Sequence, residues 1–204
     1  ILSNIIRKNF IENNELIIET FDKKIEDPLI IENLRNEYLD FINYFNHKQK
    51  KITDKAPLNF RWIGFIKVLF PKARIIHCVR EPKNNCLSMF KNLFEGGLNF
   101  TYDQEDLVKF YKHYVKLMNF WKSNYSSDIM DVHYEDLISS SHNTIEKIVK
   151  FCNLEWEENC LKFYKNKTPI KTMSTAQARK PIYKTSLKSF EKYKDYLTIL
   201  EESL

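Results

Sequence analysis

Residues 72–88 read "KARIIHCVREPKNNCLS", and this stretch decides the fold class. Its apolar part, residues 74–79, is short and rich in β-branched side chains, which predicts a buried strand. The strand stops at Arg80, and Pro82 follows, a residue favoured at the first position of a helix. We therefore predict a helix over residues 82–94, ended by the two glycines that come after it.

The rest of the chain alternates helical periodicity with one more apolar strand. Apolar residues recur every three or four positions in seven segments, which predicts helices over residues 1–14, 28–50, 58–70, 104–125, 141–153, 157–164 and 186–204. Residues 127–137, "SDIMDVHYEDL", predict a second strand that leaves into a polar turn. This alternation is typical of a parallel sheet with helices on its faces, so the fold class that we expect is α/β, a helix-rich three-layer α/β/α arrangement.

Length and composition indicate one globular domain. The chain has 204 residues, of which 43% are hydrophobic and 29% charged, a balance that is not typical of disordered or membrane-embedded chains. We therefore expect residues 1–204 to form a single domain, with no membrane span and no visible signal peptide. The four cysteines show neither CxxC spacing nor a metal-ligand pattern, so we expect reduced thiols, no bound metal and a cytoplasmic protein.

The charge and the glycine content add two expectations. The net charge of +5 is small for this length, and the basic residues are interspersed, which fits an anionic ligand better than nucleic acid. Only 3 glycines are present, and the chain begins at Ile1 inside an expected helix. We interpret the sequence as a fragment whose glycine-rich part lies elsewhere. No feature of it indicates an oligomeric state.

Arg80 and the helix after it predict an anion-binding site. Ligands of open α/β sheets bind beyond the carboxyl ends of the strands, where Arg80 stands. Asn84, Asn85 and Ser88 follow in the first turns of the helix, so backbone N–H groups, a hydroxyl and a guanidinium would converge on one point. A phosphate group suits these donors. The alternative is a capped helix beside a solvated arginine, and this stretch alone leaves both open.

Lys55 offers a second cation for the same anion. It lies in a turn formed by Asp54 and Pro57, directly before an expected helix. A cation about 4 Å from an anionic oxygen is worth roughly 4 kcal/mol at an effective dielectric constant of 20, before desolvation is subtracted. A solvated turn lysine is the alternative.

Residues 174–186, "STAQARKPIYKTS", form a long stretch without periodicity. It mixes hydroxyl groups with Gln177, Arg179 and Lys180, while Tyr183 can anchor it to the rest of the protein. A long loop of this composition in a compact domain is usually functional or disordered, and the aromatic anchor favours an ordered, functional loop.

Four other polar residues near the strand ends have structural explanations. His77 and His133 each stand one step from the ligand edge, and we favour packed strand histidines over acid and base roles. Glu135 and Asp136 could lie near an acceptor, but the motif "YEDL" more often caps the turn after a strand, which is the interpretation we favour.

Three ordered motifs resemble those of sulfotransferases. They are "DKAPLNFRWIGFIKVLFPKARIIHCVREPKNNCLSMF", "VHYEDLI" and "STAQARKPIYKTSLKSFEKY", and the likeness extends over residues 38–196. The most similar types are the bacterial sulfotransferases often fused to tetratricopeptide repeats and the tyrosylprotein sulfotransferases. The resemblance implies a P-loop-like sulfotransferase fold and 3′-phosphoadenosine 5′-phosphosulfate as co-substrate. It also implies transfer of the sulfuryl group to a hydroxyl, without a metal.

The resemblance assigns roles to residues that match the motifs. Arg80 and Ser88 would bind the 3′-phosphate, and residues 177–183 would fold over the nucleotide. Lys55 and Ser174 would contact the phosphosulfate and stabilise the leaving oxygen, as catalytic residues. Near the end of the chain the family has a basic residue followed by tryptophan, for which Lys188 is a substitute. The residues predicted to bind the nucleotide are therefore Arg80, Ser88, Gln177, Arg179, Lys180, Tyr183 and Lys188.

Two family features do not occur in this sequence. One is the glycine- and serine-rich loop between a strand and a helix that binds the 5′-phosphosulfate. The other is the catalytic base, a glutamate or a histidine. Both would fall before Ile1, so we expect this fragment by itself to bind nucleotide poorly and to be inactive.

Two other classes of function stay open. A non-catalytic nucleotide-binding module could use the same phosphate site to regulate an interaction. A basic helical module that binds RNA predicts a strong dependence on salt instead. The acceptor also stays open among protein tyrosine, carbohydrate and small-molecule alcohols.

Overall fold

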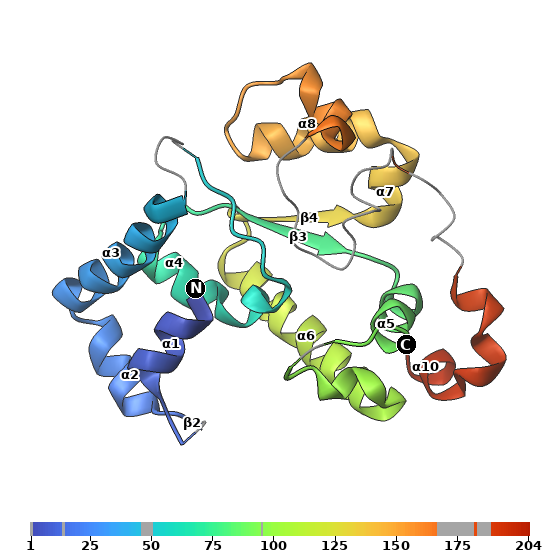
Figure 1. Ribbon diagram of the computed structural model, residues 1–204, viewed down its shortest axis with the longest axis horizontal. Helices are drawn as coiled ribbons and strands as arrows, with labels where there is room; N and C mark the ends of the chain where they lie inside the picture. Colours follow the sequence, from blue (N-terminus) through green and yellow to red (C-terminus); the bar gives the residue numbers. More distant parts are fainter. Residues whose placement is uncertain (1, 14, 46–50, 95, 167–181, 183–188) are drawn as a thin grey trace. The chain divides into compact units, whose positions relative to one another are not determined.

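The computed structural model describes residues 2–13, 15–45, 51–94, 96–166, 182 and 189–204. The chain divides into two compact units, Ile1–Ala73 and Arg74–Leu204 (Figure 1). The single domain expected for residues 1–204 stays a prediction. Within the described part of the chain, no helix is both long enough and apolar enough to cross a bilayer.

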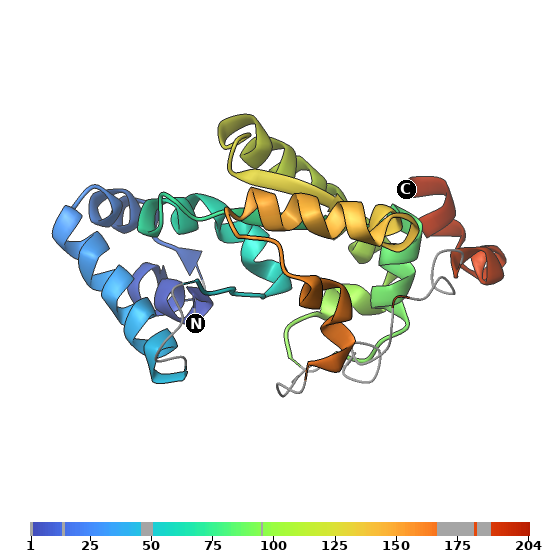
Figure 2. The same cartoon turned by 90° about the horizontal axis from the view of Figure 1, so that it is seen from above.

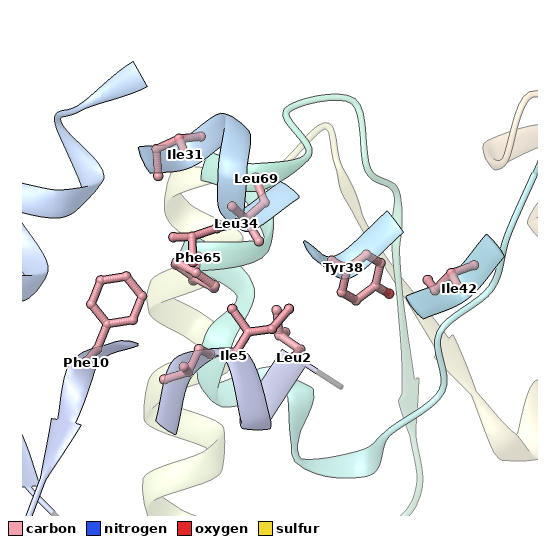
Figure 3. Close-up of a cluster of buried hydrophobic side chains, with 10 residues drawn as sticks. Leu2, Ile5, Phe10, Ile31, Leu34, Tyr38, Ile42, Phe65 and Leu69 are labelled. Carbon is pink, nitrogen blue, oxygen red and sulfur yellow. The ribbon is translucent and has the colours of Figure 1, made fainter. Parts of the chain in front are cut away.

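Unit 1 is helical and has its own apolar core. Its elements, in chain order, are α1 (Leu2–Phe10), β1 (Ile11–Glu12), β2 (Glu15–Leu16), α2 (Ile18–Ile25), α3 (Pro28–Phe45), the 3₁₀ helix η1 (Pro57–Trp62) and α4 (Ile63–Leu69). Side chains from α1, α3 and α4 meet in one buried cluster (Figure 3), among them Leu2, Ile5, Phe10, Ile31, Leu34, Tyr38, Ile42, Phe65 and Leu69. Burial of each large apolar side chain contributes about 1.5–3 kcal/mol, so this cluster stabilises unit 1.

The start of unit 1 differs from the sequence prediction. The helix predicted over residues 1–14 ends at Phe10, and an antiparallel hairpin follows in which Ile11 pairs with Leu16. Asn13 has a φ of 49°, a left-handed conformation that asparagine tolerates better than most residues, so the chain reverses there. Helix α2 was not predicted. It is short, and its apolar residues Phe21 and Ile25 pack only partly buried against the core of unit 1.

Unit 2 contains the parallel sheet. Its elements are β3 (Ile75–Val79), α5 (Pro82–Phe90), η2 (Asn99–Tyr102), α6 (Gln104–Asn124), β4 (Ile129–His133), α7 (Tyr134–Ser139), α8 (Ser141–Phe151), η3 (Glu158–Lys165), η4 (Phe190–Lys192), η5 (Lys194–Tyr196) and α10 (Thr198–Ser203). The described strands of this unit form a two-stranded sheet in which β3 and β4 are parallel. The helix-rich α/β class with a parallel sheet is therefore confirmed, whereas the full three-layer arrangement stays a prediction.

Helices lie on either side of these two strands. In the view of Figure 1, α8 and α6 lie on opposite sides of β3 and β4. Side chains on one sheet face contact α6, since His77 reaches Tyr114 and Asp131 reaches Lys122. The prediction of a buried strand is wrong for part of β3: Ile76 is 38% exposed, and Cys78, two residues later, is also exposed.

The end of the chain also differs from the prediction. Residues 189–204 form the short segments η4, η5 and α10 instead of one helix over 186–204. They lie beside α5 in both views (Figures 1 and 2). The chain bends at Tyr193, whose φ and ψ are −126° and 2°, and so brings Phe190, Leu197 and Leu200 into one buried cluster with α5 and α6. Packing of these three side chains outweighs the helical periodicity of the sequence.

Candidate functional site

The carboxyl ends of β3 and β4 lie side by side because the strands are parallel. The last pair in their register is Val79 with His133. Continued past the strand ends, the same register brings together the pairs on which the site is built, Arg80 with Tyr134 and Glu81 with Glu135.

Arg80 lies against an aromatic ring at this edge. The central carbon of its guanidinium group is 5.0 Å from the centroid of the Tyr134 ring, a distance typical of a cation–π interaction. Both residues are half-buried. The contact therefore holds the guanidinium at the carboxyl end of β3, where the sequence predicts an anion-binding site.

Glu81 caps the helix that follows. Its carboxylate accepts hydrogen bonds from the backbone N–H groups of Lys83, at 3.1 Å, and Asn84, at 2.7 Å. A carboxylate at this position is favourable because it satisfies N–H groups that have no partner within the helix and interacts well with the helix dipole. The sequence left open whether the N–H groups of this turn bind an anion or are capped. Glu81 caps those of Lys83 and Asn84, so the expectation that they bind the anion is wrong.

Asn84 is a structural clamp. Its Nδ2 donates to Glu81 Oε2 at 2.6 Å, and its Oδ1 accepts from the backbone N–H of Phe190 at 2.9 Å. The residue is 7% exposed. Both ends of its amide group serve these contacts, so the suggestion that Asn84 helps to bind the anion is also wrong. It fastens the segment beginning at Ser189 to α5.

Lys83, beside Asn84, adds a second link between α5 and the end of the chain. Its Nζ lies 2.9 Å from Oε2 of Glu201 in α10 and 5.8 Å from the centroid of the Phe190 ring. Both side chains of the ion pair are partly exposed, so the pair contributes at most about 1 kcal/mol. The link still directs this lysine toward α10.

Ser88 lies on α5, one turn after Asn84, and is half-buried. Its backbone carbonyl accepts a hydrogen bond from Nδ2 of Asn92. Arg80 lies two residues before the start of α5, and Ser88 lies within this helix. Whether both contact an anion stays a prediction.

Glu135 reaches across the sheet edge. Its Oε1 accepts a hydrogen bond from the backbone N–H of Glu81 at 3.0 Å. The sequence analysis favoured a local cap of the turn after β4, with an acceptor site as the alternative. The carboxylate does satisfy a backbone N–H, but that N–H belongs to the turn after β3, 54 residues earlier in the chain.

The two histidines near this edge have different surroundings. His77 is bound on both ring nitrogens: Nδ1 lies 2.7 Å from Asp131 Oδ1, and Nε2 contacts the hydroxyl of Tyr114. Its side chain is 11% exposed, which supports the packed histidine that we favoured. His133 is exposed instead, so the same interpretation is wrong for it.

Lys55 lies in unit 1, in the irregular segment before η1, and is exposed. Its neighbour Asp54 accepts a hydrogen bond through Oδ2 from the hydroxyl of Tyr38, at 2.8 Å. Tyr38 is buried in α3, and burial together with the hydrogen bond to Asp54 raises the pKa of its hydroxyl well above the usual value. The hydroxyl therefore stays protonated and anchors the turn that carries Lys55.

Six predicted site residues lie outside the described residues, so their assignments stay predictions. They are Ser174, Gln177, Arg179, Lys180, Tyr183 and Lys188.

Comparison with known proteins assigns the family. A model of the sulfotransferase family matches residues 7–158. The chain belongs to the sulfotransferase family. The match includes β3, α5 and β4, and so takes in the whole of the edge at which Arg80, Tyr134 and Glu135 meet.

Two relatives of this sulfotransferase family member are longer proteins. This chain is 30% identical over 181 residues to an Aquifex aeolicus protein named "Uncharacterized protein", and the aligned region covers 87% of this chain and 24% of that protein. It is 22% identical over 156 residues to a Caenorhabditis briggsae protein named "Putative protein-tyrosine sulfotransferase", and this aligned region covers 76% of this chain and 52% of that protein. The chain thus spans about a quarter and about half of their respective lengths.

Sequence reasoning missed three contributors to the site. Pro82 is favoured at the first position of a helix, which makes the residue before it, Glu81, the N-cap. Tyr134 directly follows strand β4. Aligning the ends of the two strands, with Val79 opposite His133, places it beside Arg80. Tyr38 has no local signal, because its hydroxyl meets Asp54 only after α3 packs in unit 1.

Proposed function

We propose that the protein of which this chain is part transfers a sulfuryl group from 3′-phosphoadenosine 5′-phosphosulfate to a hydroxyl group. Family membership supports the reaction class. The observation that carries the proposal is the place of Arg80, at the carboxyl end of a parallel strand and against Tyr134. Ligands of α/β sheets bind at this edge, and a guanidinium is a strong partner for a phosphate.

The 3′-phosphate is assigned to Arg80 and Ser88. Two carboxylates, Glu81 and Glu135, lie near Arg80, and free carboxylates would repel an anion. Both accept hydrogen bonds from backbone N–H groups of the same turn. Their charge is therefore partly offset locally, which lessens their repulsion of an anion at the guanidinium.

Lys55 and Ser174 are assigned to the phosphosulfate. Sulfuryl transfer resembles phosphoryl transfer, in which the protein contributes mainly positioning and stabilisation of charge. A cation at Lys55 would neutralise charge that develops on the leaving oxygen. No metal is required for this role. The residues 177–183 and Lys188 are assigned to the nucleotide on the resemblance of their motif alone.

Protein tyrosine is the acceptor that the comparisons favour, because the Caenorhabditis briggsae relative is named a protein-tyrosine sulfotransferase. Carbohydrate and small-molecule alcohols are the other hydroxyl acceptors to be tested. One assay can compare the three classes with radiolabelled sulfate in the donor.

A nucleotide-binding module without transferase activity is the second candidate. One observation favours it: Gly64 lies within α4, while Gly96 and Gly97 follow α5. None of the three glycines forms a loop between a strand and a helix that could bind the 5′-phosphosulfate. Binding without transfer, in the longest natural protein that contains this chain, would support this candidate.

Calorimetric titration of adenosine 3′,5′-bisphosphate tests the nucleotide site directly. We expect weak binding to the wild-type chain, a further loss of at least tenfold in Arg80→Ala and a smaller loss in Ser88→Ala. Arg74→Ala is the matched control, because Arg74 precedes β3 and pairs with Asp128. Equal loss in Arg74→Ala and Arg80→Ala would contradict the assignment.

A further inference from the structure

The turn between β3 and α5 is held by α7, the helix that directly follows the neighbouring strand β4. The hydrogen bond from the Glu81 N–H to Glu135 Oε1, at 3.0 Å, joins this turn to the residue that follows Tyr134. Tyr134 in turn lies 5.0 Å from the guanidinium carbon of Arg80. Two successive residues of the "YEDL" motif therefore contact two successive residues of the "VREP" motif.

These contacts act on different parts of Arg80. The Tyr134 ring limits where the guanidinium can lie, while the Glu135 carboxylate fixes the peptide group on the carboxyl side of Arg80. A long side chain is placed well only if its backbone is also fixed, because a small rotation there moves the charged end much further. Within the described part of the chain, the Glu135 carboxylate is the acceptor for this N–H.

We propose that Glu135 is a positioning residue for Arg80, which acts through the backbone of the turn at Glu81 and makes the site selective for a 3′-phosphate. This inference rests on the proposed function for its ligand. Glu135 acts through its carboxylate oxygen, which accepts the hydrogen bond from the Glu81 N–H. Its negative charge is a disadvantage, because it lies near the position assigned to the phosphate.

Two substitutions distinguish the effect of the negative charge of Glu135 from the effect of its hydrogen-bond acceptor. Glu135→Gln keeps an oxygen that can accept from the Glu81 N–H and removes the charge, whereas Glu135→Ala removes both. Adenosine 3′,5′-bisphosphate and adenosine 5′-monophosphate serve as probes, since they differ only in the 3′-phosphate. Glu146→Ala is the control, because Glu146 is an exposed glutamate of α8 whose carboxylate lies 3.9 Å from His142.

We expect Glu135→Ala to bind the bisphosphate about tenfold more weakly and the monophosphate within twofold of wild type. Glu135→Gln should bind the bisphosphate no more than threefold more weakly than wild type. Combining Glu135→Ala with Arg80→Ala should cost little beyond Arg80→Ala alone. A purely structural role would weaken both probes equally in Glu135→Ala, and that result would overturn the proposal, as would equal losses in the Gln and Ala variants.

Hydrogen exchange of the native chain gives a readout that needs no ligand. Peptides covering Arg80 and Glu81 should exchange at least fivefold faster in Glu135→Ala and at the wild-type rate in Glu135→Gln and Glu146→Ala. Unchanged exchange in Glu135→Ala overturns the positioning role, whether or not nucleotide binds. If the wild-type chain binds neither probe while exchange changes as expected, the proposed nucleotide site is wrong. The role of Glu135 in fixing the backbone at Glu81 is then still confirmed.

Discussion

His77 and Asp131 lie opposite each other in adjacent parallel strands, and Nδ1 of His77 is 2.7 Å from Oδ1 of Asp131. The other carboxylate oxygen of Asp131 lies 2.9 Å from Nζ of Lys122 in α6. One carboxylate thus joins β3, β4 and α6. Of these elements, β3 and β4 lead directly to Arg80 and Tyr134 at the edge where the site is built.

The Asp131 network predicts a loss of stability in acid. Partial burial by itself would raise the pKa of Asp131, but the hydrogen bonds from His77 and Lys122 and the attraction of their charges outweigh it, so the pKa is lowered. A carboxylate with a lowered pKa in the folded state stabilises the fold above its unfolded pKa of about 3.9. That stability is lost as the pH falls from about 5 through the lowered folded pKa.

Asp131→Asn should therefore be less stable than wild type at pH 7, and the difference should shrink toward pH 3. Thermal unfolding between pH 3 and 7 measures it. Asp103→Asn is an unsuitable comparison because Asp103 caps α6. Asp195→Asn, in η5 and exposed, is the control. A difference between Asp131→Asn and wild type that does not change with pH would contradict the prediction.

Tyr38→Phe should disturb the turn that carries Lys55. The substitution removes the hydroxyl that donates to Asp54 at 2.8 Å and leaves the buried ring in place. We expect a loss of about 0.5–1.5 kcal/mol in the free energy of unfolding. Hydrogen exchange over residues 51–56 should rise, and any transferase activity should fall without a change in bisphosphate affinity.

Tyr196→Phe is the control for this experiment, since Tyr196 is 81% exposed. Asp54→Asn keeps an acceptor for the Tyr38 hydroxyl and should have a smaller effect than Asp54→Ala. If Tyr38→Phe left the exchange of residues 51–56 unchanged, the anchoring role of its hydroxyl would be wrong.

Asn84→Ala should release the end of the chain from α5. The Phe190 N–H and the Glu81 carboxylate would each lose a buried partner, and leaving one buried polar group unsatisfied costs about 1–3 kcal/mol. We expect a lower unfolding temperature and faster exchange over residues 190–204. Asn85→Ala is a matched control on the same helix, and an equal loss in this variant would argue against a specific clamp.

Cys86 and Cys78 should differ in reactivity toward thiol reagents. Burial, with a smaller contribution from the negative charge of Glu81, raises the pKa of the Cys86 thiol to about 12. The thiolate is the reactive form, so Cys86 should not react in the folded chain at pH 8. Cys78 is exposed and should react. Titration with a chromogenic disulfide, followed by peptide mapping, distinguishes them, and rapid labelling of Cys86 in the folded state would contradict the prediction.

Several features of this protein follow from local sequence. The β-branched run before Arg80 predicts β3, the proline after it predicts the start of α5, and the same reasoning predicts β4. These elements have their signals within a few residues, because strand and helix preferences act locally. The position of Arg80 at a sheet edge follows from the same signals.

Other features depend on contacts between distant residues. Asn84 and the N–H groups at the start of α5 were predicted to lie at an anion site, yet Asn84 binds Phe190 and Glu81 caps the helix. A polar side chain next to a helix start can bind a ligand, a backbone N–H or another segment, and the sequence does not distinguish these options. The end of the chain was predicted as a helix for a similar reason: its periodicity is helical, but the packing of Phe190, Leu197 and Leu200 bends it.

The sequence by itself determined the α/β class, the two parallel strands and the location of Arg80 beyond the first of them. Only the tertiary structure decided that Tyr134 supports the guanidinium and that Glu135 holds the turn at Glu81. The physical reason is the register of β3 and β4. It pairs residues that are 54 positions apart, and the register is set by the packing of whole strands and helices, which no local pattern contains.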